Sequence, residues 1–375
     1  MRLGLDARAL ASPVRSGVEH YVINLTRALA ALPEAPDIIA YVDRPITDPA
    51  LSDLSSERLK IAVLRARRGW LRAALPWRLW RDHADLVHLP STILPPILPC
   101  PAVVTVHDLA WARFPETYDA ADLRMQTRVV PRSLRRAAHI IAVSQSTARD
   151  LTETLDVPAD KITAIPLGVS PSFSPDGPAL SPDAFPGAEH LAGGYILHLA
   201  TGGPHPRKNV AGLLEAYARL RADHPAPPLV VAGDVSSKRG RVLLDAAAHL
   251  GLAEDVIFPG QVSEAVLPAL YRSAIILAYP SLYEGFGLPI LEAMASGLPV
   301  ITSNRSSMPE AAGDAAVLVD PESLEDLTAT LARALTDDAL RRDLAQRGLA
   351  RSREFTWDRT ARETIAVYQR IGGRG

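Results

Sequence analysis

The sequence has almost no cysteine: Cys100 is the only one among 375 residues. A single thiol excludes an internal disulfide framework and is typical of a protein from a reducing compartment. No group of cysteines and histidines has the spacing of a zinc site, so we expect no bound metal. No apolar run reaches the length that spans a membrane, and the N-terminus enters an expected strand without the apolar region of a signal peptide. These absences predict a cytoplasmic protein.

An excess of charge of one sign is also missing. The 40 lysines and arginines nearly balance the 42 aspartates and glutamates, which leaves a net charge of −2. This balance argues against a general nucleic-acid-binding protein, because such proteins carry basic surfaces. A chain of 375 residues exceeds the size at which one hydrophobic core usually stops growing. We therefore expect two domains.

Short apolar runs alternate with helical or irregular segments, which predicts an α/β fold with parallel sheets. The expected strands cover residues 2–6, 38–42, 61–64, 86–89, 102–106, 140–144, 162–166, 195–200, 229–232, 256–258, 274–278, 298–302 and 315–319. Helical spacing covers residues 18–31, and a last helix is expected at 358–371. Prolines recur between Pro171 and Pro186, which indicates an extended linker.

Residues 279–310 carry the clearest site pattern. A buried strand is expected before this stretch, and a glycine-containing loop follows it. Pro289 then suits the first turn of a helix and Gly297 suits its end. Backbone N–H groups at such a helix start, at the carboxyl end of a parallel sheet, form a site for phosphate or another anion.

Two carboxylates, Glu284 and Glu292, flank this expected anion site. If the residues between them were all helical, the two would lie roughly 12 Å apart along the axis. That separation is too large for an acid/base dyad, but it suits hydroxyl groups at the two ends of a long ligand such as a nucleotide sugar. The alternative from spacing alone is a buried helix with two ordinary surface glutamates.

The residue sequence of this stretch resembles that of a known family. Residues 280–300 read Pro-Ser-Leu-Tyr-Glu-Gly-Phe-Gly-Leu-Pro-Ile-Leu-Glu-Ala-Met-Ala-Ser-Gly-Leu-Pro-Val. They are similar to the Glu-x7-Glu signature of the retaining glycosyltransferases of family four. The resemblance implies the GT-B architecture, in which two Rossmann-like domains with parallel sheets face each other across a cleft. It also implies a nucleoside diphosphate sugar as the donor, with no metal or other cofactor.

A pair of cations, Arg207 and Lys208, follows the expected strand at 195–200. Two adjacent positive charges at a strand-to-helix loop suit a diphosphate, and they can stabilise a departing nucleoside diphosphate without a metal. An Arg-Lys pair alone is common. With Asn209 after it, the pair resembles the family's motif at this place.

The resemblance assigns further expected roles. His107, at the end of the strand 102–106, is expected to contact the donor sugar, although an isolated His-Asp pair would favour a capping Asp108 beside a surface histidine. His-Asp-Leu followed by Pro115-Glu116 resembles mannosyltransferase-like members. Glu284 is expected to hold the transferred sugar and Glu292 the ribose. The remaining expected donor-binding residues are Gly17 near the diphosphate and acceptor, Val262 near the nucleobase, and the amides of Gly285, Phe286, Gly287 and Leu288.

The same resemblance implies a division of the chain into three parts. Residues 1–172 form an expected acceptor-binding Rossmann-like domain, and residues 188–355 form an expected nucleotide-sugar-binding domain. Residues 356–375 are expected to send a helix back to the first domain. Gly17 could also open a dinucleotide site, but the sequence around it lacks the Gly-x-Gly-x-x-Gly pattern.

The segment from Arg65 to Arg81 combines tryptophans with arginines. This combination indicates peripheral contact with an anionic membrane surface. However, Pro76 interrupts the run, and the pattern is not a clean amphipathic helix. The alternative is tryptophans packed on the sheet and solvated arginines.

The sequence therefore predicts a retaining glycosyltransferase that moves a sugar, most simply mannose from GDP-mannose, to a hydroxyl of a glycan or lipid-linked acceptor. A UDP-sugar donor remains an alternative, as does a GT-B epimerase or hydrolase. A nicotinamide oxidoreductase and a non-catalytic nucleotide-sugar sensor are weaker alternatives.

Overall fold

The computed structural model describes residues 1–12, 16–51, 54, 56–66, 69–200, 203 and 205–373. The chain divides into two compact units, each described here by itself. Unit 1 comprises Met1–Gly168 and Thr356–Gly375, and unit 2 comprises Val169–Phe355. All thirteen strands that the sequence predicts are present, with ends that agree to within two residues. This confirms the predicted α/β fold class.

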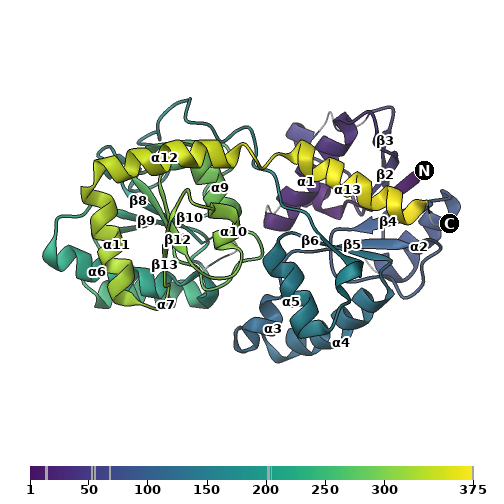
Figure 1. Ribbon diagram of the computed structural model, residues 1–375, viewed down its shortest axis with the longest axis horizontal. Coiled ribbons are helices and arrows are strands. Elements are labelled where there is room, and N and C mark those ends of the chain that lie inside the picture. Colours follow the sequence, from purple (N-terminus) through teal and green to yellow (C-terminus); the bar gives the residue numbers. More distant parts are fainter. Residues whose placement is uncertain are drawn as a thin grey trace. The chain divides into compact units, whose positions relative to one another are not determined.

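Unit 1 is built on a parallel sheet of seven strands in the order β3-β2-β1-β4-β5-β6-β7. Its helices cover both faces, with α1 packed beside the yellow C-terminal helix α13 in Figure 1. The strands are β1 (Arg2–Asp6), β2 (Asp37–Val42), β3 (Leu59–Val63), β4 (Leu86–Leu89), β5 (Ala102–Val106), β6 (His139–Ala142) and β7 (Ile162–Ala164). The helices are α1 (Gly17–Ala31), α2 (Leu75–Arg81), α3 (Ala110–Arg113), α4 (Ala120–Arg136), α5 (Gln145–Leu155) and α13 (Trp357–Gly372).

Unit 2 contains a parallel sheet of six strands in the order β10-β9-β8-β11-β12-β13. Helices α6, α7 and α11 share one hydrophobic core, and α9 packs against α12 (Figure 1). The strands are β8 (Ile196–Leu199), β9 (Leu229–Ala232), β10 (Val256–Gly260), β11 (Ile276–Tyr279), β12 (Val300–Ser303) and β13 (Val317–Val319). The helices are α6 (Val210–Asp223), α7 (Lys238–His249), α8 (Leu267–Ser273), α9 (Leu288–Ala295), α10 (Met308–Ala312), α11 (Leu324–Thr336) and α12 (Asp338–Ser352).

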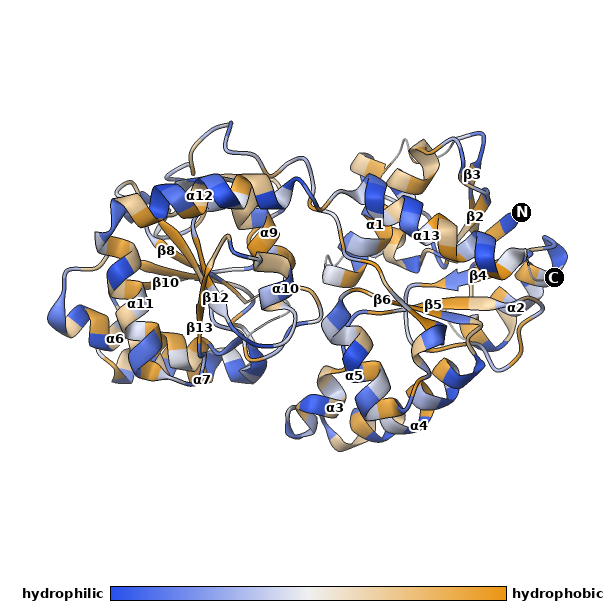
Figure 2. Ribbon diagram, in the orientation of Figure 1, coloured by the Kyte–Doolittle hydropathy of each residue, from blue (hydrophilic) through white to orange (hydrophobic). Residues whose placement is uncertain are grey.

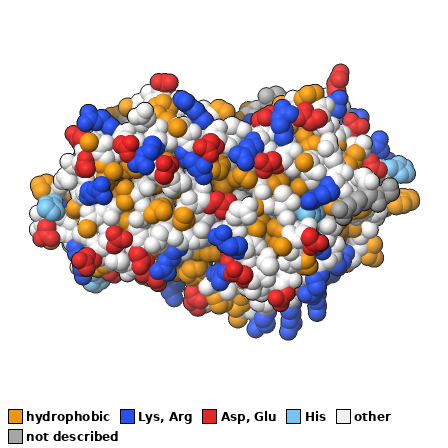
Figure 3. Space-filling view, viewed as in Figure 1, with side chains coloured by type: hydrophobic (Ala, Val, Ile, Leu, Met, Phe, Trp, Pro, Cys, Tyr) orange, Lys and Arg blue, Asp and Glu red, His pale blue; other side chains and the backbone are white. Residues whose placement is uncertain are grey.

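The apolar character of the strands explains both sheets. Helices cover both faces of a parallel sheet, so its strands read as continuous apolar runs. Most strands are accordingly coloured hydrophobic in Figure 2, whereas most helices mix polar and apolar residues. On the surface that Figure 3 shows, acidic and basic side chains are interspersed.

Each sheet has one point at which the strand order reverses. In unit 1 this switch point lies between β1 and β4, and in unit 2 it lies between β8 and β11. Ligands of open α/β sheets bind outside the carboxyl ends of the strands at such points. The segments that follow these four strands are therefore where each unit is expected to bind small molecules.

Close backbone packing fixes the return of the chain to unit 1. A Cβ atom added to Gly168 would lie 2.2 Å from the backbone nitrogen of Trp357. The Thr360 hydroxyl also donates to the Pro166 carbonyl over 2.8 Å. The start of α13 can pack here only because residue 168 is glycine.

The segment between Arg65 and Arg81 divides its tryptophans between core and surface. Trp70 is buried, but the residues Trp77 and Trp80 are 52% and 66% exposed. The alternative of tryptophans packed on the sheet is therefore wrong for these two, because Leu75 and Leu79 take the buried face of α2 instead. Arg67 and Arg68, which belong to the same expectation, lie outside the described residues.

Candidate active site

The switch point of unit 2 brings two expected site segments together. A single turn of 3-10 helix, Pro206–Lys208, follows β8, and the loop with Glu284 follows β11. The Leu282 amide donates to the Arg207 carbonyl over 2.7 Å, which joins the two loops. Strands β8 and β11 are neighbours in the sheet although their residues lie about eighty positions apart in sequence.

Arg207, Lys208 and Glu284 form one interlocked cluster. Lys208 Nζ donates to Glu284 Oε1 over 2.7 Å, and Arg207 donates to Glu284 Oε2 over 3.2 Å. The Tyr279 hydroxyl accepts from Lys208 over 2.9 Å and donates to Glu284 Oε1 over 2.7 Å. Only 5% of the Lys208 side chain and 9% of the Glu284 side chain is exposed. The cluster therefore holds two cations and one anion away from bulk water.

The charges of this cluster determine the protonation of Glu284. Burial by itself would raise the pKa of the Glu284 carboxyl. The positive charges of Lys208 and Arg207, with the hydrogen bonds from Lys208 and Tyr279, outweigh burial and lower the pKa to about 2. Glu284 is ionised at neutral pH, so the cluster carries a net charge of one positive unit that favours an anionic ligand.

The loop after Glu284 is held by two serines and a glycine. The hydroxyls of Ser306 and Ser307 donate to the Glu284 carbonyl over 2.6 and 2.9 Å. Gly287 then has φ +95°, a left-handed conformation that favours glycine, and α9 begins directly after it. Pro289 lies in the first turn and Gly297 follows the end of α9, as predicted. The amides of Gly285–Leu288 therefore approach the N-terminus of a helix, where anions are favoured.

Glu292 lies on α9 and binds a residue of the preceding helix. The Tyr271 hydroxyl, on α8, donates to Glu292 Oε2 over 2.7 Å. Burial of the carboxyl raises the pKa of Glu292 to about 7, with a further contribution from the charge of Glu264, although the bond from Tyr271 opposes the rise. Glu284 and Glu292 are thus neither ordinary surface glutamates nor equivalent to each other.

Two other expected donor residues have simpler environments. Val262 follows β10 at the carboxyl end of the sheet, just after Gly260 at φ +75°. The Phe286 ring is buried edge-on against Phe355, with centroids 5.9 Å apart. Phe286 can therefore serve a ligand only through its backbone.

His107 lies in unit 1, at the carboxyl end of β5. Asp108 Oδ1 accepts from the Ala110 amide over 3.0 Å, but Asp108 is not the N-cap of α3, which is Leu109. His107 is not a surface histidine, because its Nε2 atom is buried and has no hydrogen-bond partner among the described residues. Burial lowers its pKa, although Asp108, a bond with the Pro90 backbone and Glu19 oppose this effect. The ring is therefore neutral at pH 7.

A buried chain of polar side chains supports His107. The Tyr21 ring lies edge-on to the His107 ring, with centroids 5.0 Å apart. The Tyr21 hydroxyl bonds Thr105 Oγ1 over 2.9 Å, and Thr105 bonds His88 Nε2 over 2.8 Å. His88 Nδ1 in turn bonds the Tyr368 hydroxyl of α13 over 2.6 Å. The chain links α1, β4, β5 and α13 behind the His107 ring.

Gly17 is the first residue of α1. Ser16 and Glu19 form a capping box at this helix start. A Cβ atom added to Gly17 would meet no described atom within 4 Å, and its φ is not in the left-handed region. Nothing in the described chain therefore requires glycine at this position.

Several residues around the clusters were not singled out from the sequence. They are Tyr271, Tyr279, Ser306 and Ser307 in unit 2, and Tyr21, His88, Thr105 and Tyr368 in unit 1. Tyr279 could have been found, because it ends β11 beside the site. Ser306 and Ser307 lie within the same stretch 279–310, and Thr105 lies two residues before His107, but no local pattern marks their contacts. Tyr271, Tyr21, His88 and Tyr368 reach the sites from other segments. Among the described residues, no group of three or more His, Cys, Asp or Glu side chains could hold a metal ion.

The described helices include none with the length and apolar content needed to cross a bilayer.

Solved structures share the fold of the chain. Sucrose-phosphate synthase from Thermosynechococcus elongatus superimposes with a TM-score of 0.77 at 21% identity, covering 100% of both chains. Anabaena HepE in complex with UDP and glucose gives a TM-score of 0.75 at 18% identity, covering 99% of both chains. These similarities define the class: the chain has the GT-B fold, as predicted.

Sequence comparison defines the family within that class. The family model described as "Glycosyltransferase Family 4" matches residues 15–173, and the family model described as "Glycosyl transferases group 1" matches residues 189–351. O-antigen chain mannosyltransferase B from Escherichia coli is 31% identical over 371 residues, which cover 94% of this chain and 96% of that protein. The chain therefore belongs to glycosyltransferase family 4 and is a hexosyltransferase, which confirms the predicted enzyme class.

A second relative matches part of the chain. The serotype-specific mannosyltransferase WbdA from Escherichia coli is 35% identical over 239 residues. The match covers 63% of this chain and 29% of WbdA. Mannosyltransferases are therefore among the relatives, and the chain spans less than a third of WbdA.

Proposed function

We propose that this glycosyltransferase transfers mannose from GDP-mannose to a hydroxyl group of a glycan or lipid-linked acceptor, with retention of the anomeric configuration. The names of the two relatives support mannose as the sugar. The observation that carries the proposal is the cluster of Arg207, Lys208 and Glu284 at the switch point of unit 2, beside the start of α9. Its net positive charge and helix N-terminus suit a diphosphate.

Each expected site residue has a role in this proposal. Arg207 and Lys208 bind the diphosphate, and the amides of Gly285–Leu288 support the phosphate and the sugar hydroxyls. Glu284 accepts a hydrogen bond from a hydroxyl of the transferred sugar, and Glu292 accepts one from the ribose. The backbone at Val262 contacts the nucleobase. From unit 1, the buried Nε2 of His107 bonds the sugar, and Gly17 leaves space beside the diphosphate and acceptor.

The proposed reaction takes place on one face of the sugar. The bond between the anomeric carbon and the phosphate oxygen breaks, and a bond from that carbon to the acceptor oxygen forms on the same face. The acceptor's proton moves to the departing phosphate oxygen, so no protein nucleophile is needed. Arg207 and Lys208 stabilise the negative charge that develops on the leaving group, a role that a preorganised electrostatic site performs without a metal.

A transfer assay tests this function. The protein is incubated with GDP-mannose, UDP-glucose or UDP-N-acetylglucosamine, each with and without a mannoside acceptor and with EDTA. We expect acceptor-dependent release of GDP from GDP-mannose, an α-linked product by NMR, and no loss of rate in EDTA. Turnover with a UDP-sugar and none with GDP-mannose would show that the donor is the UDP-sugar. Free sugar or an inverted sugar centre without acceptor would indicate a hydrolase or epimerase.

We also propose that the exposed face of α2 contacts an anionic membrane surface. Trp77 and Trp80 are exposed there, and the Arg81 guanidinium lies 5.3 Å from the centroid of the Trp77 ring. Basic and aromatic side chains on one face favour the interface of anionic lipids. Flotation with phosphatidylglycerol vesicles at low salt should carry the protein upward, and Trp77→Ala/Trp80→Ala should weaken this binding. No flotation of the unaltered protein would contradict the proposal.

A further inference from the structure

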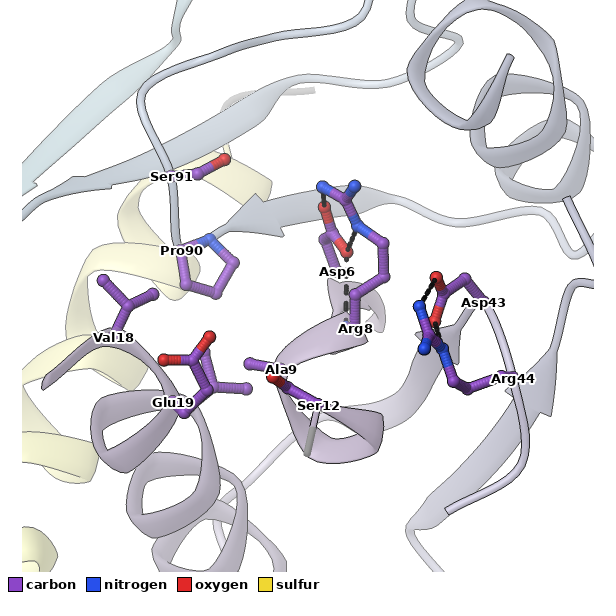
Figure 4. Close-up of a pocket in the computed structure, with 11 residues that line it drawn as sticks. Asp6, Arg8, Ala9, Ser12, Val18, Glu19, Asp43, Arg44, Pro90 and Ser91 are labelled. Atoms are coloured by element: carbon purple, nitrogen blue, oxygen red, sulfur yellow. Dashed lines mark hydrogen bonds and ion pairs between the residues drawn. The ribbon is translucent and has the colours of Figure 1, made fainter. Parts of the chain in front are cut away.

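A cavity lies at the switch point of unit 1. Its volume is 320 Å³, near the lower end of roughly 300–1,000 Å³ that is usual for small-molecule sites. The segments after β1, β2 and β4 and the first two turns of α1 form its walls (Figure 4). It therefore occupies the place where an open α/β sheet binds ligands.

Five charged side chains line this cavity. Arg8 pairs with Asp6 through two hydrogen bonds of 2.9 and 2.8 Å, and Arg44 pairs with Asp43 through bonds of 3.2 and 3.0 Å. Glu19 is the third carboxylate, and in Figure 4 it lies on the α1 side of the cavity, away from both arginines. The lining thus contains three carboxylates and two guanidinium groups, and each guanidinium is already bound to a carboxylate.

This arrangement discriminates between kinds of sugar. A phosphate group would meet cations that are already neutralised, together with an excess of negative charge. Hydroxyl groups can both donate to carboxylate oxygens and accept from guanidinium N–H groups, so a neutral polyol suits a lining of this kind. Arg8 is further held by the Trp70 ring, whose centroid lies 5.2 Å from its guanidinium carbon.

The cavity also adjoins His107. Pro90 lines the cavity, and its backbone forms the hydrogen bond with His107. Glu19, on another wall, is near enough to act on the charge of the same ring. A molecule in the cavity would therefore lie beside the residue that we expect to contact the transferred sugar.

We propose that this cavity binds the sugar residue of the acceptor that receives the mannose, and that it selects a neutral, hydroxyl-rich sugar over a phosphorylated one. This inference rests on the proposed transferase function and specifies its acceptor. The pairs Asp6–Arg8 and Asp43–Arg44 and the carboxylate of Glu19 are its specificity-determining groups.

Ligand-observed NMR titration of the full chain tests this selection with methyl α-mannoside and mannose 6-phosphate. We expect the neutral sugar to bind more tightly. Asp43→Asn removes one negative charge and releases Arg44, so affinity for mannose 6-phosphate should rise about two- to fivefold, the range of one exposed ion pair, while affinity for the mannoside changes less. The matched control is Asp37→Asn, an exposed carboxylate at the opposite end of β2, which should leave both affinities unchanged.

Three outcomes would overturn the proposal: tighter binding of mannose 6-phosphate by the unaltered protein, binding of neither sugar, or equal effects of Asp43→Asn and Asp37→Asn. Titration of the same samples with GDP-mannose separates this failure from failure of the proposed function. If GDP-mannose binds and neither sugar does, only the acceptor site is wrong. If no nucleotide sugar binds, the proposed function is wrong even where the mannoside binds the cavity.

Discussion

The two switch points of this enzyme have the same backbone arrangement and opposite charge balances. In unit 2, two cations surround one carboxylate, whereas the unit 1 cavity is lined by three carboxylates and two guanidinium groups. The unit 2 cluster is nearly closed to water, while 38% of the Arg8 side chain in unit 1 is exposed. The sheet places both sites, but the residues after the strands decide whether a site favours an anion or a neutral polyol.

The largest expected effect comes from breaking the charge balance of unit 2. Glu284→Gln keeps the shape but leaves Lys208 and Arg207 without their buried anion. Loss of one preorganised contact to the transition state should lower kcat by about 100-fold or more. Loss of a buried charge partner should also lower the free energy of unfolding of unit 2 by about 3–5 kcal/mol, the usual cost of removing one partner of a buried ion pair. Steady-state kinetics and urea unfolding measure the two effects.

Glu322→Gln is the matched control for that change. Glu322 pairs with Arg305 on the surface of the same unit, at 2.6 Å and 62% exposure. Surface pairs contribute little, so kcat should stay near that of the unaltered protein. Near-normal turnover of Glu284→Gln would remove Glu284 from the catalytic account.

The next expected effect tests the buried chain behind His107 in unit 1. Tyr21→Phe keeps the ring against His107 but removes the hydroxyl bond to Thr105. We expect a loss of about 1 kcal/mol in the free energy of unfolding and a several-fold fall in kcat, because the ring that packs on His107 is less firmly held. The control is Tyr217→Phe, which loses a buried hydroxyl bond to the Pro227 carbonyl in unit 2. Equal kcat values for the two variants would show that the Tyr21 hydroxyl serves stability alone.

The smallest expected effect concerns pH and Glu292. Its pKa is raised from 4.5 to about 7, so the carboxyl gains its charge as the pH rises through 7. Because an ionised carboxylate accepts stronger hydrogen bonds, binding of GDP-mannose should tighten a few-fold between pH 6 and pH 8.

Folding stability responds in the opposite sense. The folded chain keeps a proton that the unfolded chain loses, so the contribution of Glu292 to stability falls between about pH 4.5 and pH 7. Calorimetry at both pH values measures the affinity, and Glu292→Gln should abolish its change; a variant with the same pH dependence would assign the titration to another group.

Much of this comparison could be predicted from the sequence. Period and composition predicted every strand, and Pro289 and Gly297 predicted the limits of α9. The resemblance to the family placed Arg207, Lys208 and Glu284 at one donor site, but the sequence did not predict that the two cations pair directly with Glu284. The exact strand ends did not follow, because they depend on pairing with neighbouring strands.

The supporting residues could not be predicted. His88 bonds Tyr368 across 280 positions of sequence, and Ser306 holds the Glu284 carbonyl from 22 positions away. Such contacts arise from tertiary packing, which leaves no periodic signal in either segment. The same reason explains the surface tryptophans of α2: the sequence left open whether these tryptophans pack on the sheet, and only the packing of Leu75 and Leu79 decided it.

The central claim is that the unit 2 cluster binds the donor's diphosphate, and Lys208 tests it most directly. GDP-mannose is titrated by calorimetry into the unaltered protein, Lys208→Met and the control Lys238→Met, an exposed lysine at the start of α7 in the same unit. Loss of one charge-assisted bond in a buried site should weaken Kd about tenfold or more for Lys208→Met and leave the control unchanged. Equal affinity of all three proteins, each shown to be folded by its thermal transition, would contradict the account.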